Sequence, residues 1–224
     1  MRTVLASVLA LSAAVCMRSW NGHLPHALWL PAALLVAAAG LVWHRQLASQ
    51  LLARAVLWSN LILGVLITAL GHGRERMIAV ALAAATSGAL LLLGRRGLGE
   101  GTPGTFAPIA FRRTLLALMV MALADAQTLI FFGTLTFEDS FGYASRAAVY
   151  FALGGGLLLG IIGLYRLRVW GLLVHAASCG ALIATALAGV LRLPVELGWA
   201  LVATAVAQLV ISAPLAFRLV RGRS

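Results

Sequence analysis

The chain has 224 residues, of which 62% are hydrophobic and only 10% charged, and its mean hydropathy is +1.00. A soluble domain is nearer half apolar and a quarter charged, so this composition excludes an ordinary water-soluble protein and predicts a membrane protein. The net charge of +11 comes from 17 arginines, which occur singly or in pairs at the ends of apolar runs. That pattern is typical of topology determinants and lipid-headgroup anchors, so we expect lipid contacts and no nucleic-acid partner.

Eight apolar runs follow one another, separated by mostly short polar turns. They cover residues 3–17, 24–43, 51–70, 77–93, 115–136, 147–164, 169–191 and 197–217. A membrane crossing takes about 20 apolar residues, and long unbroken runs exclude a barrel. The predicted fold class is therefore all-α, a polytopic transmembrane helical bundle with eight spans. The first run also resembles a signal peptide, and its cleavage would leave seven spans.

The longest non-apolar stretch divides the chain into two sets of four spans. We predict a first transmembrane half at 1–94, a cytoplasmic Gly/Pro/Arg linker at 95–114, a second half at 115–217 and a basic cytoplasmic tail at 218–224. The third span of each half contains a similar tetrapeptide, GVLI from Gly64 and GALI from Gly180. These matches support the hypothesis of a tandem duplication with both halves in the same orientation.

The arginines predict how the chain is threaded. With eight spans, twelve of the 17 arginines fall on the side that holds both termini, and five fall on the other side. Because arginine-rich loops stay in the cytoplasm, both termini are expected there. The arginine-only, acid-poor composition is typical of a GC-rich bacterial genome. The expected location is the bacterial cytoplasmic (inner) membrane, with the chain as a multi-pass plasma membrane protein.

Asp125 is the main candidate for a functional group. It lies near the middle of the fifth run, where a carboxylate costs a few kcal/mol or more unless it is protonated or paired. The functional hypothesis is an ion or proton site formed by Asp125 with Gln127 and Thr128, assisted by His175 and Asn60. The alternative is a structural clamp that joins helices by hydrogen bonds. Arg54 and Gln208 are further polar groups within the runs, and the Arg54 side chain is expected to extend to the cytoplasmic surface.

No cofactor or metal site follows from the spacing of the possible ligands. A bis-histidine haem needs two histidines at matched depth, and only His175 is expected deep in the membrane. Cys16 and Cys179 both fall in apolar runs, form no ligand spacing and are expected to behave as small buried hydrophobes. No catalytic residue is assigned, and an intramembrane enzyme stays open without a complete set of reacting groups.

Gly156, Gly160 and Gly163 are expected to support helix packing. The first two are four residues apart, so they share one helical face and let a neighbouring backbone approach closely. Two functions remain open. One is a non-catalytic membrane component or scaffold that interacts with other membrane proteins or with itself. The other is a small-solute or proton-coupled transporter that uses Asp125 with His175.

Overall fold

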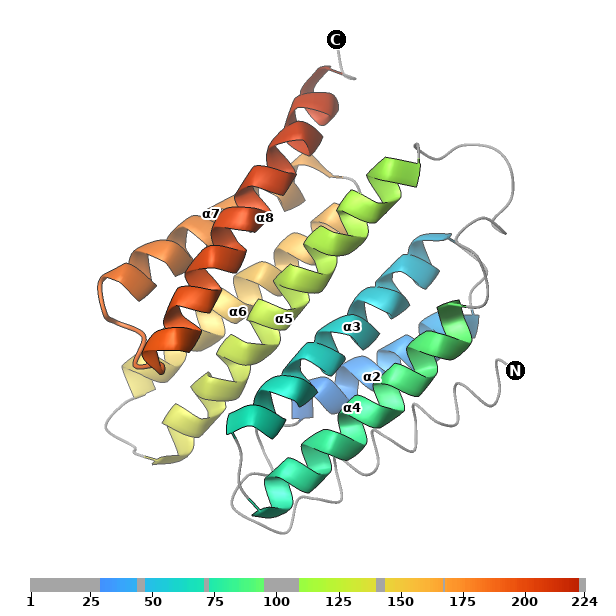
Figure 1. The fold of residues 1–224 in the computed structure, drawn as a ribbon. Helices are drawn as coiled ribbons and strands as arrows, with labels where there is room; N and C mark the ends of the chain where they lie inside the picture. The colour runs from blue at the N-terminus through green and yellow to red at the C-terminus, as the bar shows by residue number, and fades with distance from the viewer. Residues whose placement is uncertain are drawn as a thin grey trace. The chain divides into compact units, whose positions relative to one another are not determined.

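The structure, a computed structural model, describes residues 29–43, 47–70, 73–94, 109–139, 144–166 and 168–221. All regular elements within these ranges are α-helices, which confirms the all-α prediction. They are α2 (Trp29–Trp43), α3 (Leu47–Leu70), α4 (Gly73–Gly94), α5 (Ile109–Asp139), α6 (Ala144–Tyr165), α7 (Val169–Leu187) and α8 (Val195–Arg221) (Figure 1). The predicted first run, 3–17, lies outside the described residues.

Five of the described helices are long and apolar enough to cross a membrane. The crossing segments are Ser49–Ala69, Arg113–Phe137, Ser145–Tyr165, Val169–Leu187 and Val195–Pro214. Two further helices contain shorter apolar stretches, Trp29–Leu41 in α2 and Ala79–Leu91 in α4. The chain is therefore a membrane protein with transmembrane helices, as its composition predicts. α5 begins at Ile109, inside the segment that the sequence assigns to the linker.

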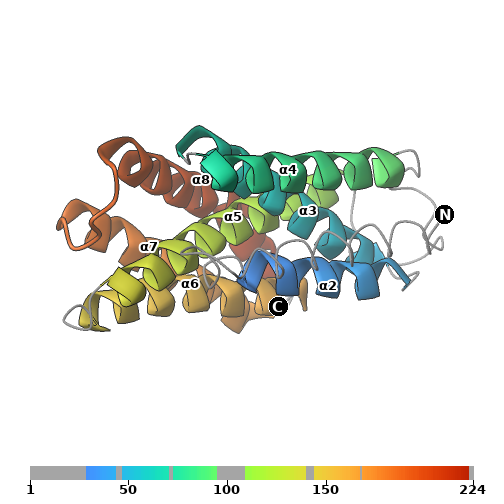
Figure 2. The same ribbon diagram turned by 90° about the horizontal axis from the view of Figure 1, so that it is seen from below.

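The described helices belong to two compact units. Unit 1 covers Met1–Val120, and unit 2 covers Met121–Ser224. In unit 1, α3 packs against both α2 and α4 (Figure 2). The contact between α3 and α4 is close at Gly64, where an added Cβ would lie 3.3 Å from the Cβ of Ala83. Fully buried leucines, among them Leu57 and Leu63, fill the core of this unit.

Unit 2 contains the C-terminal part of α5 together with α6, α7 and α8. α7 packs against both α6 and α8. α5 approaches α6 at Gly154, where an added Cβ would lie 2.7 Å from Cγ1 of Ile130. The core is formed by buried residues from all four helices, together with Leu191 from the connection between α7 and α8: Ala126, Leu129, Tyr150, Leu153, Leu157, Cys179, Leu182, Leu191, Leu201 and Ala205.

α7 ends four residues before the end of the apolar run that predicts it. The cause is Gly189, whose φ of +68° lies in the left-handed region that a residue with a Cβ adopts only under strain. The backbone N–H of Gly189 donates to the carbonyl of Ala186 at 3.1 Å, and that of Val190 donates to the carbonyl of Thr185 at 3.1 Å. These two bonds form a Schellman motif, which satisfies the last carbonyls of the helix.

The glycines of α6 lie against α7. A Cβ at Gly156 would meet Oγ of Ser178 at 2.5 Å, and a Cβ at Gly160 would meet the Cα and Cβ of His175 at 2.9 Å. One turn further, Gly163 lies directly against Gly171. The absence of side chains at these positions lets the two helices approach closely, and this places the backbone of His175 against α6.

Candidate functional site: a buried polar cluster

Asp125 lies on α5 in unit 2 and is bonded to α8. Its side chain is 4% exposed. The hydroxyl of Thr204 is a hydrogen-bond donor and lies 3.0 Å from Oδ1 and 2.9 Å from Oδ2 of Asp125. The amide Nε2 of Gln208 donates to Oδ2 at 2.6 Å. A buried carboxylate is costly unless other groups satisfy it, and here two side chains of one neighbouring helix do so.

The sequence of α8 explains why both donors reach the same carboxylate. Thr204 and Gln208 are four residues apart, so they lie one above the other on the same face of the helix. Ala205 and Leu201, which are also buried, continue this face toward the core of unit 2. The opposite side of α8 exposes Trp199 and Val210. One polar pair within an otherwise apolar inner face therefore fixes the rotation of α8 about its axis.

α7 extends the cluster through Cys179 and His175, which are again four residues apart. The thiol Sγ of Cys179 lies 3.8 Å from Oε1 of Gln208 and 3.7 Å from Nε2 of His175. Both α7 side chains have no exposed surface. The other ring nitrogen of His175, Nδ1, has no hydrogen-bond partner. Asp125 and His175 therefore belong to one polar cluster, and Gln208 and Cys179 connect them.

The other predicted site residues are Gln127, Thr128 and Asn60, and the side-chain hydrogen bonds of Thr128 and Asn60 stay within their own helices. Gln127 is buried on α5, but two residues along a helix turn a side chain by about 200°, so it faces away from Asp125. The hydroxyl of Thr128 donates to the carbonyl of Ala124 on its own helix at 2.8 Å. Asn60 lies on α3 in unit 1, where its Nδ2 donates to the carbonyl of Val56 at 2.9 Å.

Sequence reasoning missed the roles of Thr204 and Cys179 and gave Gln208 no partner. Threonine and cysteine are common in apolar helices, and neither type signals a site by itself. The available signal was spacing, because the pairs 204/208 and 175/179 each put two polar side chains on one helical face. Which faces meet depends on the rotation of α7 and α8, and the apolar pattern of these helices leaves that rotation open.

The cluster contains one histidine, one cysteine and one carboxylate, but they do not surround a common point. Within the described part of the chain, no group of three or more His, Cys, Asp or Glu side chains could hold a metal ion. The arrangement is a sequence of hydrogen bonds that crosses from α5 through α8 to α7. It can join three helices, and it can transmit a change at Asp125 to the imidazole of His175.

No protein-family model, curated protein or solved structure matches the chain. The geometry of the cluster is therefore the basis for its functional interpretation.

Proposed function

We propose that this protein is a non-catalytic component of a bacterial inner membrane that interacts with other membrane proteins. The observation that supports this proposal is the closure of the polar cluster around Asp125. The Thr204 hydroxyl lies within hydrogen-bond distance of both carboxylate oxygens, Gln208 donates to Oδ2, and the side chain of Asp125 is almost fully buried. A carboxylate that already holds α8 against α5 acts as a clamp between helices, as buried polar groups often do in membranes.

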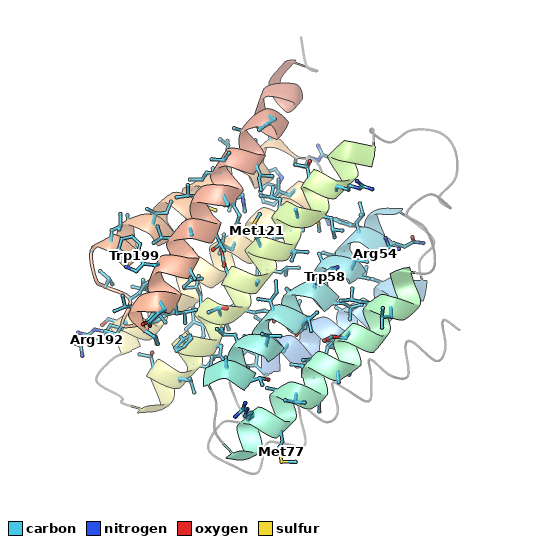
Figure 3. The ribbon with its side chains drawn as sticks, viewed as in Figure 1. Arg54, Trp58, Met77, Met121, Arg192 and Trp199 are labelled. Atoms are coloured by element: carbon cyan, nitrogen blue, oxygen red, sulfur yellow. The ribbon has the colours of Figure 1, made fainter. Side chains whose placement is uncertain are left out.

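The partner surface in this proposal is the outer face of α7 and α8. Leu173, Trp199, Val206 and Val210 expose large apolar side chains on it, and in Figure 3 Trp199 lies near the start of α8. In a membrane such a face contacts either lipid or another apolar helix. Position-specific crosslinking in native membranes distinguishes these two cases.

A photo-crosslinking amino acid at Val206 or Val210 is expected to yield discrete protein adducts. The matched control is the same amino acid at Trp58 on α3, which is 45% exposed but belongs to unit 1. Adducts with lipid alone at both α8 positions would contradict the scaffold proposal. Adducts of the same size at Trp58 would show that the partner does not select the α7–α8 face.

Proton-coupled transport is the second candidate, supported by the connection between Asp125 and His175 through Gln208 and Cys179. It is tested by proton and solute flux in liposomes that contain the wild type or Asp125→Asn. This substitution keeps the size of the side chain and one acceptor oxygen but removes the carboxylate. Flux that is equal in both proteins, or absent from both, would reject this candidate and leave the scaffold proposal standing.

The proposal includes eight spans with both termini in the cytoplasm and the two halves related by tandem duplication. Its support is the arginine distribution, twelve on the inner side and five on the outer side, and the repeated GVLI and GALI tetrapeptides. The two glycines of these tetrapeptides have different surroundings. Gly64 packs against Ala83 of α4, whereas an added Cβ at Gly180 would meet nothing within 4 Å. The duplication therefore concerns the order of the helices, not their detailed packing.

A further inference from the structure

The orientation of the Gln208 amide follows from the group that it faces. The oxygen and nitrogen of a side-chain amide have nearly the same shape, so the hydrogen-bond network decides which is which. One end lies 2.6 Å from Oδ2 of Asp125. The structure places the NH₂ group there, the arrangement that an ionised carboxylate requires because an amide oxygen would repel it. Oε1 then points toward α7, where Sγ of Cys179 lies 3.8 Å away.

The Cys179 thiol has a single proton. Donation of that proton to Oε1 of Gln208 determines which tautomer His175 must adopt. A thiol that donates to Gln208 can only accept at its second neighbour, Nε2 of His175, which lies 3.7 Å from Sγ. Nε2 must then carry the imidazole proton. Every donor along this chain points the same way, from His175 to Cys179 to Gln208 to Asp125, and such aligned hydrogen bonds strengthen one another.

The unpartnered nitrogen of His175 leads independently to the same tautomer. Nδ1 is fully buried and has no hydrogen-bond partner. Orphaned N–H groups are rarer in protein interiors than acceptors with unused lone pairs. A bare Nδ1 is therefore less costly than a protonated one, and the single proton of a neutral imidazole again falls on Nε2.

We propose that Gln208 and Cys179 are positioning residues that hold His175 as its Nε2–H tautomer, so that Nδ1 is the free acceptor of the cluster. The ligand class for Nδ1 is a proton or a small molecule with an N–H or O–H donor, such as water. Asp125 is then the anchor that sets the direction of the chain, and the accepting group lies on α7. This inference goes beyond the scaffold proposal and holds whether or not the protein transports protons.

The direct test is the tautomer of His175 in the wild-type protein. Protein labelled with ¹³C and ¹⁵N at histidine is placed in lipid nanodiscs, and the ring chemical shifts are recorded by NMR. The chain has five histidines, so a His175→Gln sample identifies the signal by its loss. We expect the Nε2–H pattern at neutral pH. An Nδ1–H pattern, or a ring that is already doubly protonated at neutral pH and so has no free Nδ1, would overturn the proposal.

Gln208→Leu tests whether the chain imposes this tautomer. Without Oε1 the thiol loses its acceptor and is free to donate to Nε2, so the preference for Nε2–H is expected to weaken and the fraction of rings with the proton on Nδ1 to rise. Thr204→Val is the matched control, since it removes another donor to Asp125 but leaves Gln208 and Cys179 in place. An unchanged tautomer in Gln208→Leu, or an equal change in Thr204→Val, would show that the amide does not position the ring.

Infrared spectroscopy gives a second readout on the thiol. In a Cys16→Ser background Cys179 is the only thiol of the chain, so the S–H stretching band reports on it alone. We expect the wild-type band to differ from the band in Gln208→Leu, because the acceptor of the S–H changes from the Gln208 oxygen to Nε2 of His175. An unmoved band would contradict the proposal. If Gln208→Leu does not fold, Cys179→Ala takes its place in the NMR experiment and is expected to lose the preference for Nε2–H. Retention of the preference would contradict the proposal.

Discussion

A carboxylate inside a membrane protein needs partners, and Asp125 finds them on a helix that comes about 80 residues later in the chain. The bonds from Thr204 and Gln208 are short, at 2.6–3.0 Å. Interhelical hydrogen bonds in membranes average ~0.6 kcal/mol and reach ~1.7 kcal/mol. Bonds to a charged acceptor are about twice as strong as neutral ones, so an ionised Asp125 would place this pair at the upper end of that range.

Thr204→Val removes the hydroxyl and nearly preserves the shape of the side chain. We expect the free energy of unfolding to fall by about 1–2 kcal/mol, since the carboxylate loses a donor in a buried place. The measurement is a reversible denaturant titration in mixed micelles. Thr185→Val on α7 is the control, because its hydroxyl donates to the carbonyls of Ala181 and Leu182 on its own helix. An equal loss in both variants would show that Thr204 does not act between helices.

Asp125 and His175 could be found from the sequence because ionisable side chains are rare in apolar runs and costly at membrane depth. Their connection could not be predicted. It depends on Gln208, whose amide reaches both α5 and α7, and on Cys179, which in an apolar segment has the pattern of an ordinary small hydrophobe. Asn60 shows the opposite case, because it is equally conspicuous in the sequence yet bonds its own helix in unit 1.

At the scale of helices, α6 and α7 are held together by backbone proximity more than by large side chains. Gly156, Gly160 and Gly163 recur at intervals of four and three residues, which keeps them on one face of α6. The sequence predicts their packing role from that spacing. It does not predict that Gly160 faces His175, which requires the register between two antiparallel helices. Through this contact the α6–α7 packing also fixes the depth of the imidazole.

Gly160→Ala tests this contact. The new Cβ would lie 2.9 Å from the Cα and Cβ of His175, so one helix must shift. Overpacking of this kind costs about 1–3 kcal/mol, and we expect that loss in the same titration. Gly155→Ala on the same helix is the control, because an added Cβ there meets nothing within 4 Å. Alanine is the better helix former by ~1 kcal/mol, so this variant is expected to gain stability slightly. Similar values for the two variants would argue against close packing at Gly160.

For the whole molecule, composition alone predicts a membrane location and an all-α fold. So much apolar surface can be buried only in lipid or against other apolar helices. The number of spans is harder to derive. Apolar runs vary in length, and the apolar stretches of α2 and α4 are shorter than those of the other described helices. Threading adds a second constraint, since each added or removed span would invert the side of every later arginine.

The last span provides the sharpest test of the threading. α8 lies between the segment around Arg192 and the basic C-terminus at Arg221–Ser224, so a spanning α8 must put them on opposite sides of the membrane. A reporter that is active only outside the cytoplasm is fused after Leu193 in one protein and after Ser224 in another, and a reporter that is active only inside is fused at the same two points. We expect the first reporter to be active at Leu193 and the second at Ser224, because the arginine bias keeps the tail inside. With the N-terminus in the cytoplasm, the reverse pattern would mean that an even number of spans precedes α8. Activity on one side for both fusions would mean that α8 does not cross.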